Sequence, residues 1–443
     1  MRLLSCLYLA ATGAALAAAP APRRLPPEEV SRARTMLEDI DRALLENYYP
    51  TSRLDKAHDA RIAAARQALG EAKSNNDANA IIADALAALD PRIRLYPPLR
   101  SVRVDYGWDW KIIGQDAYVT HLDTDSDARA QGLQLGDKVL AIDGAPLDRA
   151  SSQQIYYAMY ELALRPGLRV QVQSPGGEPR TLALRATLRP ARKVHNYIEA
   201  GLARLEWVFT PLEHQRQDEF LDLRNHVHRV GPVLVWRAEE LRGKIDQVGD
   251  GLKAVREAQS LVLDLRGQYV LRHETALRLL SGLFNTAFDA GYIEETGNHR
   301  GLRVSGGAGA FAGTVLVLID SETANYAEFI ARVIQQKQRG VLIGDHTMGR
   351  VFEHGQVSYA RGANFSFNIA AVTVPTGEIR LSDGYALDGK GVAPDLWLLP
   401  KPADLSAHRD VVMAKALAML KQAVTPEEAY AFFRTEPDDD EGF

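Results

Sequence analysis

The pattern of apolar and polar residues between positions 313 and 356 predicts a strand, a helix and a second strand. The β-branched run Thr314–Ile319 indicates a buried strand. A second apolar run at 341–343 indicates another strand and leads into Gly-Asp-His-Thr-Met-Gly-Arg. A strand, a sharp turn and a helix N-terminus can present a nucleophile beside backbone N–H groups and the positive end of a helix dipole. Between the two strands, apolar residues recur at helical spacing: Tyr326, Phe329, Ile330, Val333 and Ile334.

The first hundred residues contain a short apolar leader and a long helical pattern. Residues 1–19 combine one arginine, an apolar run and a small-residue end, which is typical of a secretory signal peptide and too short for a membrane span. A proline-rich linker follows, and the chain is predicted to be helical from Glu28 to about Leu89. The stretch 90–98 then breaks the helix. The apolar stripe of the helical part consists of Val30, Met36, Leu37, Ile40, Leu44 and Leu45.

Residues 128–144 carry a run of glycines and apolar residues at fixed spacings, Ala-Arg-Ala-Gln-Gly-Leu-Gln-Leu-Gly-Asp-Lys-Val-Leu-Ala-Ile-Asp-Gly. Its glycines suit turns with positive φ, and Val139 to Ile142 suits a strand. Residues 151–164 are predicted to form a helix, and 168–172 and 181–184 two closing strands. This region, about 98–192, resembles the PDZ modules of bacterial proteins.

The PDZ resemblance implies that an extended peptide adds as a strand to a sheet edge while backbone amides hold its terminal carboxylate. By family position, the candidate peptide-binding residues are Tyr106, Gly107, Trp108, Gly132 and Leu133. The tryptophans of the Tyr-Gly-Trp-Asp-Trp loop line a peptide groove in one interpretation and pack the sheet against the helix in the other. The aspartate between them would repel a carboxylate.

Several motifs downstream resemble the C-terminal-processing (tail-specific) serine peptidases, family S41. The strand motif Leu261-Val262-Leu263-Asp264-Leu265-Arg266-Gly267, the helix start Thr323–Glu328, the loop Gly344–Arg350, the segment Val372–Gly377 and the closing turn Asp388–Asp395 each match a family pattern. The resemblance extends over nearly the whole chain to about residue 399. It implies a ClpP/crotonase-like core of mixed α/β structure.

Both residues of the family's catalytic pair differ in this chain. Asn325 stands where the family has its serine, and Arg350 stands where it has its lysine. A lysine acts as general base only after losing its proton, and an arginine in a protein does not lose it. The amide of Asn325 is not a nucleophile for acyl transfer. The two substitutions predict an inactive site.

Two further positions depart from the family pattern. The family's Asn-x-Gly-Gly, which helps to form the oxyanion hole, is replaced after Gly267 by Gln268-Tyr269-Val270-Leu271. Loss of one oxyanion donor typically costs about 10²–10³ in rate. The family's Leu-x-Asp-x-His-Thr segment corresponds to Leu89-Asp90-Pro91-Arg92, which has no histidine. Neither a preorganised oxyanion hole nor a histidine-based mechanism is predicted.

Asn325 also has a structural interpretation. Asparagine is a favourable helix N-cap, and Glu328 three residues later completes an Asn-x-x-Glu capping box. The alternative catalytic interpretation is a relocated nucleophile, with His346 or His354 acting on Ser321 or Ser358. A metal site is not expected, because His226 and His228 have no third ligand at a suitable spacing.

Composition and charge exclude several classes of partner and of chemistry. The chain has 443 residues, 46% of them hydrophobic and 25% charged, so it is long enough for two to four globular domains. A net charge of −5 argues against a nucleic-acid partner. The single cysteine, Cys6, lies in the leader, so the processed chain has no disulfide, no thiol nucleophile and no cysteine-bound metal. We expect secretion across the inner membrane to a bacterial-type periplasm.

The expected fold is multidomain, α/β and α+β. We expect a signal peptide (1–19), a linker and helical segment (20–97), a PDZ-like domain (98–192), an S41-type core (193–400), and a helix from Pro402 to Leu420 with a solvated acidic tail (401–443). The expected function is binding of polypeptide segments or C-termini by a catalytically inactive S41 homologue, without a cofactor. Alternatives are an active serine endopeptidase with a rebuilt nucleophile, and a scaffold whose PDZ-like domain recruits a partner protein.

Overall fold

The computed structural model describes residues 24–50, 54, 57–97, 102–162, 165–190, 227–238, 245–270, 272–361 and 368–433. The predicted signal peptide, the acidic run at 436–441 and His226 lie outside these residues. Within the described residues, no helix is both long and apolar enough to cross a membrane.

The N-terminal segment is helical, as its apolar stripe predicts, but it consists of several helices. They are α2 (Pro27–Asn47), α3 (His58–Ala68), the 3-10 turn η2 (Leu69–Glu71) and α4 (Asn75–Leu89). Leu37, Ile40 and Leu44 of the stripe are fully buried, whereas Leu45 is exposed. Ser74 caps α4 by accepting a hydrogen bond from the Asp77 N–H.

Residues 102–190 form a small β domain with a six-stranded sheet of order β3-β4-β5-β7-β8, in which β6 pairs with β5. The predicted strands and helix of this region are confirmed, with a five-residue π-helix, η3, extending α6. A second pair, β2–β9, joins the ends of the domain. The elements are β2 (Val102–Asp105), β3 (Trp108–Ile113), β4 (Asp116–Leu122), α5 (Asp127–Ala130), β5 (Lys138–Ile142), β6 (Ala145–Pro146), α6 (Ser152–Tyr157), η3 (Ala158–Leu162), β7 (Gly167–Gln173), β8 (Arg180–Arg185) and β9 (Thr187–Pro190).

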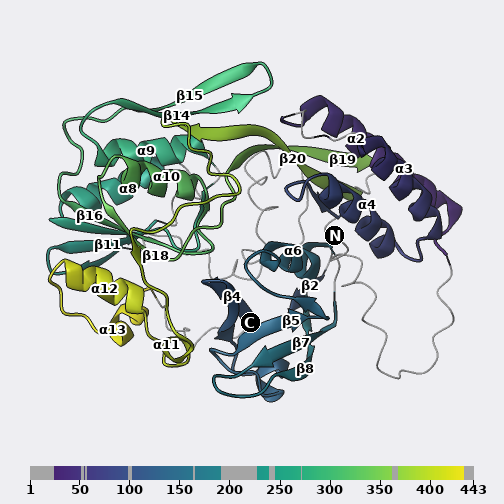
Figure 1. The fold of residues 1–443 in the computed structure, drawn as a ribbon, viewed down its shortest axis with the longest axis horizontal. Helices are drawn as coiled ribbons and strands as arrows, with labels where there is room; N and C mark the ends of the chain where they lie inside the picture. The colour runs from purple at the N-terminus through teal and green to yellow at the C-terminus, as the bar shows by residue number, and fades with distance from the viewer. Residues whose placement is uncertain are drawn as a thin grey trace.

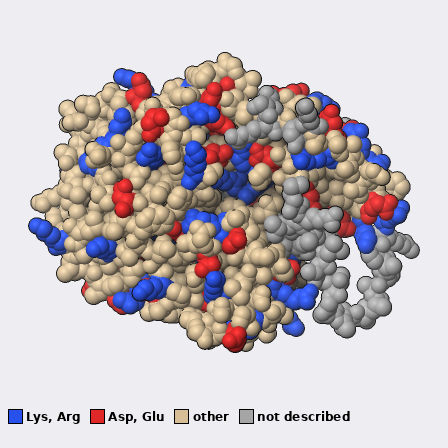
Figure 2. All heavy atoms as spheres, in the orientation of Figure 1, with Lys and Arg blue, Asp and Glu red and all other residues tan. Residues whose placement is uncertain are grey.

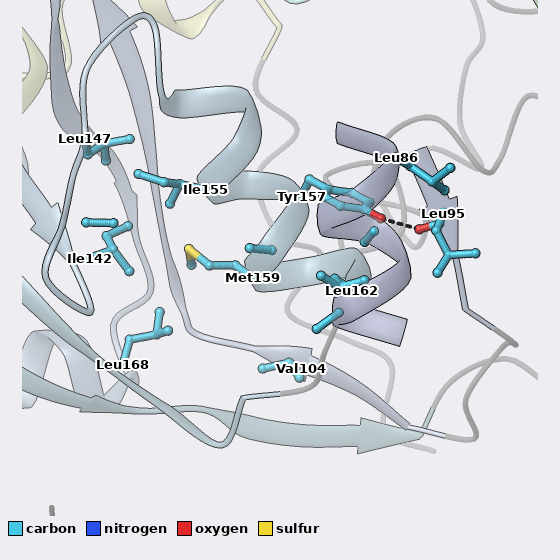
Figure 3. Close-up of a cluster of buried hydrophobic side chains, with 14 of the residues drawn as sticks. Leu86, Leu95, Val104, Ile142, Leu147, Ile155, Tyr157, Met159, Leu162 and Leu168 are labelled. Carbon is cyan, nitrogen blue, oxygen red and sulfur yellow. Dashed lines mark hydrogen bonds between the residues drawn. The ribbon is translucent and has the colours of Figure 1, made fainter. Parts of the chain in front are cut away.

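The small β domain and the N-terminal helices share one hydrophobic core. Figure 3 shows side chains of the domain, such as Ile142 and Met159, continuing toward Leu86 of α4 and Leu95. The Tyr157 hydroxyl donates a hydrogen bond of 2.5 Å to the Leu95 carbonyl across this contact. The two regions therefore pack as one body, because apolar surface of each is buried against the other.

The central sheet of the core has the order β10-β11-β12-β16-β18-β21, and all its pairs except β10–β11 are parallel. Leu261, Leu263 and Val317 pack with one set of helices, while Val262 and Leu316 pack with the other. This alternation places α8, α9 and α10 on one face and α12 and α13 on the opposite face (Figure 1). The elements are β10 (Val227–Val230), β11 (Val233–Arg237), α8 (Ile245–Arg256), β12 (Ser260–Asp264), β13 (Tyr269–Val270), α9 (His273–Leu283), β16 (Thr314–Ile319), β17 (Ala324–Asn325), α10 (Tyr326–Gln336), β18 (Val341–Gly344) and β21 (Leu396–Trp397).

A further sheet, β1-β20-β14-β15 with β19 also paired to β20, connects the core to the N-terminal helices. Its long strand β20 runs from the core toward α2 and α4 (Figure 1). The segment after α4 forms β1, which pairs with β20 so that Arg94 lies opposite Thr373. The strands are β1 (Arg94–Tyr96), β14 (Phe288–Glu295), β15 (Asn298–Val304), β19 (Phe352–Arg361) and β20 (Asn368–Leu381).

The prediction of one helix from Pro402 to Leu420 is wrong. The chain forms α11 (Pro402–Ser406), α12 (Val411–Met419) and α13 (Pro426–Ala431) instead. The Asp410 side chain accepts a hydrogen bond from the Met413 N–H and so caps the N-terminus of α12. Asp410 also pairs with Arg266 of the core, which fixes the break between α11 and α12.

Candidate functional site

The turn between β17 and α10 holds Asn325 in an unusual backbone conformation. Its φ is 53° and its ψ is −128°, a combination that residues with a Cβ seldom adopt. β17 pairs with β13, and the Asn325 N–H donates to the Arg350 carbonyl at 2.9 Å. The side chain is 1% exposed, and its Oδ1 has no hydrogen-bond partner among the described residues. The structure thus keeps a sharp strand-to-helix turn, and it buries an unpaired amide oxygen there.

The predicted capping box of Asn325 and Glu328 is wrong. The Asn325 side chain accepts no hydrogen bond from the first turn of α10, because its positive φ departs from the β-region conformation of a capping residue. Glu328 turns instead to the loop after β18. It accepts hydrogen bonds from the Thr347 hydroxyl (2.6 Å) and from the N–H groups of Gly349 and Arg350 (2.9 Å each).

Glu328 is fully buried, and burial raises its pKa to about 7. The hydrogen bonds from Thr347, Arg350 and Gly349 favour the ionised form, but loss of water around the carboxylate outweighs them. This carboxyl group therefore positions the backbone of the loop that carries Arg350. Its role could not be seen in the sequence, where Glu328 fits an ordinary capping pattern.

Arg350 is half-buried, and its guanidinium carbon lies 5.6 Å from the centre of the Phe352 ring. Among the residues that the structure describes, it forms no ion pair with a carboxylate. Burial and the Arg350 charge lower the pKa of the nearby His354 to about 4, so this imidazole is neutral at pH 7. Sequence and structure agree that position 350 presents a permanent cation and no general base.

The N–H groups of the predicted oxyanion region are both engaged. Gly267 has φ 68° and donates to Asp320 Oδ1 at 3.0 Å, while the Gln268 N–H donates to the Leu265 carbonyl at 3.1 Å. Gln268 is buried, and its carbonyl accepts from the Ala324 N–H. An oxyanion hole needs donors aimed at the reacting oxygen. Here the donors of positions 267 and 268 already satisfy groups of the protein.

The alternative nucleophile Ser321 lies at the contact between the core and the small β domain. It is buried, and its hydroxyl donates to the Ile112 carbonyl of β3 at 2.5 Å. His346 bonds through Nδ1 to the Thr347 carbonyl at 3.0 Å and stacks on Trp397. No hydrogen bond joins Ser321 to either His346 or His354 in the described part of the chain. Ser358 lies on β19.

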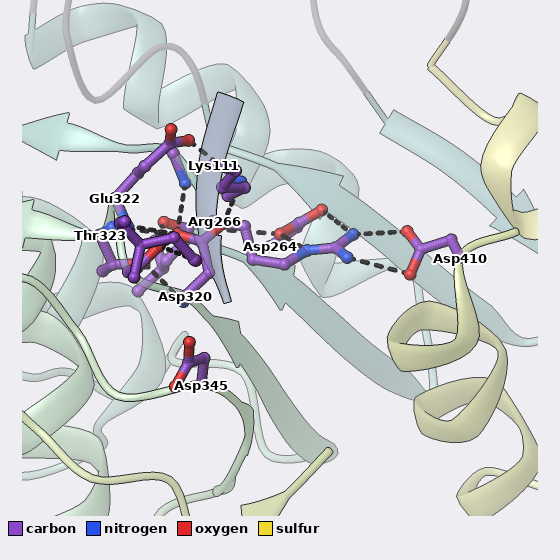
Figure 4. A network of polar contacts seen from close by, with 12 residues as sticks. Lys111, Asp264, Arg266, Asp320, Glu322, Thr323, Asp345 and Asp410 are labelled. Atoms are coloured by element: carbon purple, nitrogen blue, oxygen red, sulfur yellow. Dashed lines mark hydrogen bonds and ion pairs between the residues drawn. The ribbon is translucent and has the colours of Figure 1, made fainter. Parts of the chain in front are cut away.

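The same contact contains a cluster of charged groups, which we call the interface cluster: Lys111 of β3 with Asp320 and Glu322 of the core (Figure 4). The Lys111 ammonium lies 2.5 Å from Asp320 and 3.0 Å from Glu322. Burial alone would lower the pKa of Lys111, but the two carboxylates outweigh it and raise that pKa. Burial would raise the pKa of Asp320, but Lys111 and the N–H donors lower it. Sequence reasoning missed this cluster, because nothing in the local pattern pairs Lys111 with residues two hundred positions away.

A second link lies beside the interface cluster. The Arg149 guanidinium lies 2.7 Å from Asp345, and the Gly114 N–H donates to the same carboxylate at 2.8 Å. Arg149 also donates to the carbonyls of Gly114 (2.6 Å) and His346 (3.1 Å). The small β domain is therefore held on the core through both β3 and the segment that precedes α6.

The predicted peptide-binding residues of the small β domain lie mainly in its core. Trp108 is 2% exposed and Tyr106 and Leu133 are 1% exposed, and Gly132 forms a turn with φ 88°. The Gly107 N–H donates to the Asp105 carboxylate at 2.9 Å. The aromatic rings of this region contact one another from β3 to α6, with ring centres 5.7 Å apart for Trp110 and Tyr156. These tryptophans pack the sheet against the helix.

β3 pairs only with β4 among the described strands, so one edge of this sheet carries no neighbouring strand there.

His228 stacks on Phe432 with ring centres 4.0 Å apart, and burial lowers the pKa of His228. No group of three or more His, Cys, Asp or Glu side chains in the described part of the chain is arranged to hold a metal ion.

Comparisons with known proteins match this architecture. Residues 229–398 match the model of peptidase family S41. A stretch of 151 residues, 32% of the chain, is 28% identical to the tail-specific protease of Haemophilus influenzae and spans 20% of the length of that protein. The crystal structure of mature CPAF superposes with a TM-score of 0.59 at 13% identity, covering 86% of this chain and 94% of CPAF. CPAF complexed with lactacystin superposes with the same TM-score at 12% identity, covering 89% of this chain and 98% of that one.

Proposed function

We propose that this chain, which is a homologue of the S41 peptidases, binds polypeptide segments or C-termini without cleaving them. One observation carries the proposal: the nucleophile position is Asn325, whose amide is buried on a strained turn beside Arg350. The turn that exposes a serine in an S41 peptidase costs stability here and yields no nucleophile. Such strain is maintained where it serves a site, and binding is the function that an amide and a guanidinium can perform.

Three independent features support loss of the hydrolytic reaction. Neither Asn325 nor Arg350 can act as nucleophile or general base. The N–H groups of Gly267 and Gln268 are occupied within the protein. The segment Leu89–Arg92 lacks the family's histidine, and its Arg92 is bound by Asp90 and Asp388. Reversing only one of these three features would leave the other two obstacles to hydrolysis in place.

We further propose that residues 102–190 act as a PDZ-like module and that the protein works after export to a periplasm. The module proposal rests on the glycine turns at Gly132 and Gly136 and on the strand β5, which lies between Gly136 and Gly144. It also rests on the edge of β3, which pairs with no second strand in the described part of the chain. The export proposal rests on the sequence of residues 1–19. Polypeptides are the ligand class of both the PDZ-like module and the proposed binding site at Asn325.

The test is cleavage of an unstructured protein such as casein by the chain without residues 1–19. We expect no cleavage by the wild-type protein, and binding of the substrate measured by its retention on immobilised protein. The double variant Asn325→Ser/Arg350→Lys restores the family pair. Its cleavage activity shows whether the rest of the site can support hydrolysis. Cleavage by the wild type that is lost in Ser321→Ala would contradict the proposal and establish a rebuilt nucleophile.

A further inference from the structure

A pocket of about 420 Å³ lies between α8, α9 and the loop that follows β15. Its volume lies in the range of small-molecule sites, and no residue of the candidate functional site lines it. Figure 2 shows basic side chains over the part of the molecule where α8 and α9 lie in Figure 1. The pocket is lined by the arginines Arg256, Arg278 and Arg303 and by apolar residues that include Leu252, Leu277 and Ala310.

Hydrogen bonds join the loop 305–310 to both helices. The Arg256 Nε of α8 donates to the Gly309 carbonyl at 2.9 Å. The Ser305 N–H donates to the Ser281 hydroxyl oxygen of α9 at 3.1 Å. Gly309, Ser281 and Ser305 also line the pocket. The walls of the pocket are therefore fixed to one another by contacts between segments that lie far apart in the chain.

The charged residues of the pocket differ in their partners. The Arg303 guanidinium lies 2.8 Å from the Asp289 carboxylate. Arg256 and Arg278 form no ion pair with a carboxylate in the part of the chain that the structure describes. Glu274 is the acidic residue among the described lining residues. The lining thus carries more positive than negative charge, and two of its guanidinium groups can bind an anionic ligand.

The loop adds unpaired backbone donors to this wall. The Ala310 N–H donates to the Gly307 carbonyl at 3.0 Å and closes a turn. The N–H groups of Ala308 and Gly309 within that turn have no acceptor among the described residues, and such groups bind anions. Gly309 has no positive φ, and a Cβ added there would meet nothing within 4 Å. Neither backbone conformation nor packing requires glycine at this position, whereas close approach of a ligand to the turn would.

We propose that this pocket binds a phosphate group, held by the guanidinium groups of Arg256 and Arg278 and by the backbone of the Gly307–Ala310 turn. The oxygens of a phosphate group point in several directions, so they can accept from two helices and a loop at once, whereas the two oxygens of a carboxylate lie in one plane. The apolar lining accommodates the organic part of a phosphate ester. This site shares no residue with the proposed polypeptide site, so each can fail without the other.

The first experiment titrates inorganic phosphate with the chain without residues 1–19 and follows the linewidth of the phosphorus NMR signal. We expect the wild type to broaden the signal and Arg278→Met to bind phosphate about 10- to 100-fold more weakly, because a charge-assisted hydrogen bond is lost. The matched control is Arg185→Met, which removes an exposed arginine of β8 without an ion pair to a carboxylate among the described residues. No broadening by the wild type, or equal affinities of the two variants, would overturn the inference.

A second variant tests the turn without a change of charge. Gly309→Ala adds a methyl group where the ligand approaches the backbone, so we expect about 10-fold weaker phosphate binding with a urea midpoint no lower than that of the wild type. The control is Gly301→Ala on β15, where an added Cβ also meets nothing within 4 Å. Phosphate binding by Gly309→Ala equal to that of Gly301→Ala would show that the turn does not contact the ligand and would overturn the inference.

Two further measurements identify the anion and its source. Sodium sulfate should displace the bound phosphate, and displacement by sodium acetate at equal concentration would overturn the assignment. Sedimentation with phosphatidylglycerol vesicles that is lost in Arg278→Met would assign the phosphate to a lipid headgroup, and phosphate binding without sedimentation would assign it to a soluble molecule. Equal sedimentation of wild type and Arg278→Met, with unchanged phosphate binding in the variant, would overturn the inference.

Discussion

The core residues of the interface cluster lie a few positions before Asn325 in the sequence, yet the buried polar groups of the cluster are paired and that of the Asn325 turn is not. Asp320 accepts hydrogen bonds from the N–H groups of Gly267, Glu322 and Thr323 and pairs with Lys111. At the turn, Asn325 Oδ1 has no hydrogen-bond partner and Arg350 forms no ion pair with a carboxylate among the described residues. Groups that hold domains together are satisfied within the protein, whereas groups left unsatisfied at some cost indicate a ligand.

The largest effect is expected from Lys111→Met, which leaves the buried Asp320 and the half-buried Glu322 without their cation. Breaking a buried ion pair in this way costs about 3–5 kcal/mol. We expect a lower urea midpoint, together with earlier proteolysis between the small β domain and the core. The control is Lys253→Met, whose exposed pair with Asp250 should contribute less than about 1 kcal/mol. Similar midpoints for the two variants would show that the interface cluster does not hold the domains together.

An intermediate effect of opposite sign is expected at the Asn325 turn. Asn325→Gly should raise the free energy of unfolding by roughly 1–3 kcal/mol, because glycine relieves the strain at φ 53° and removes an unsatisfied oxygen. Asn325→Val should lower it. Gln338→Gly, at φ 52° just after α10, serves as the control, with a gain of at most about 1 kcal/mol. A gain at Asn325 no larger than that at Gln338 would mean that the turn stores no special strain.

A third effect is expected from the buried Glu328, and it depends on pH. Its pKa is about 7 in the folded chain and lies near 4.5 when unfolded, so between these values the folded state holds a proton that the unfolded state has lost. Its contribution to stability is therefore present below about pH 4.5 and is lost as pH rises through 7, by roughly 3 kcal/mol. Thermal midpoints should fall less steeply with pH in Glu328→Gln than in the wild type. The exposed Glu257→Gln is the control, and an unchanged slope in Glu328→Gln would contradict the assignment.

The main elements of the core were predictable because local pattern and tertiary environment agree there. The strand Thr314–Ile319 matches its prediction, and the helix begins at Tyr326. Both were predictable because a buried strand and a helix packed on a sheet each place apolar residues at a characteristic spacing in the sequence. The prediction failed from Pro402 to Leu420, where Asp410 pairs with Arg266, which follows β12 in the core. A local pattern carries no information about such a partner.

The sequence by itself determined the chemistry of the candidate site: Asn325 and Arg350 at the positions of a serine and a lysine, and no glycine pair after Gly267. These are properties of residue types, and folding does not change them. Only the tertiary structure decided how these groups are placed. It engages Glu328 with the loop after β18, occupies the donors at positions 267 and 268, and places Arg92 and Arg350 over the same Phe352 ring. Such contacts join residues far apart in the chain, and their energies depend on burial and distance, which arise only when the chain has folded.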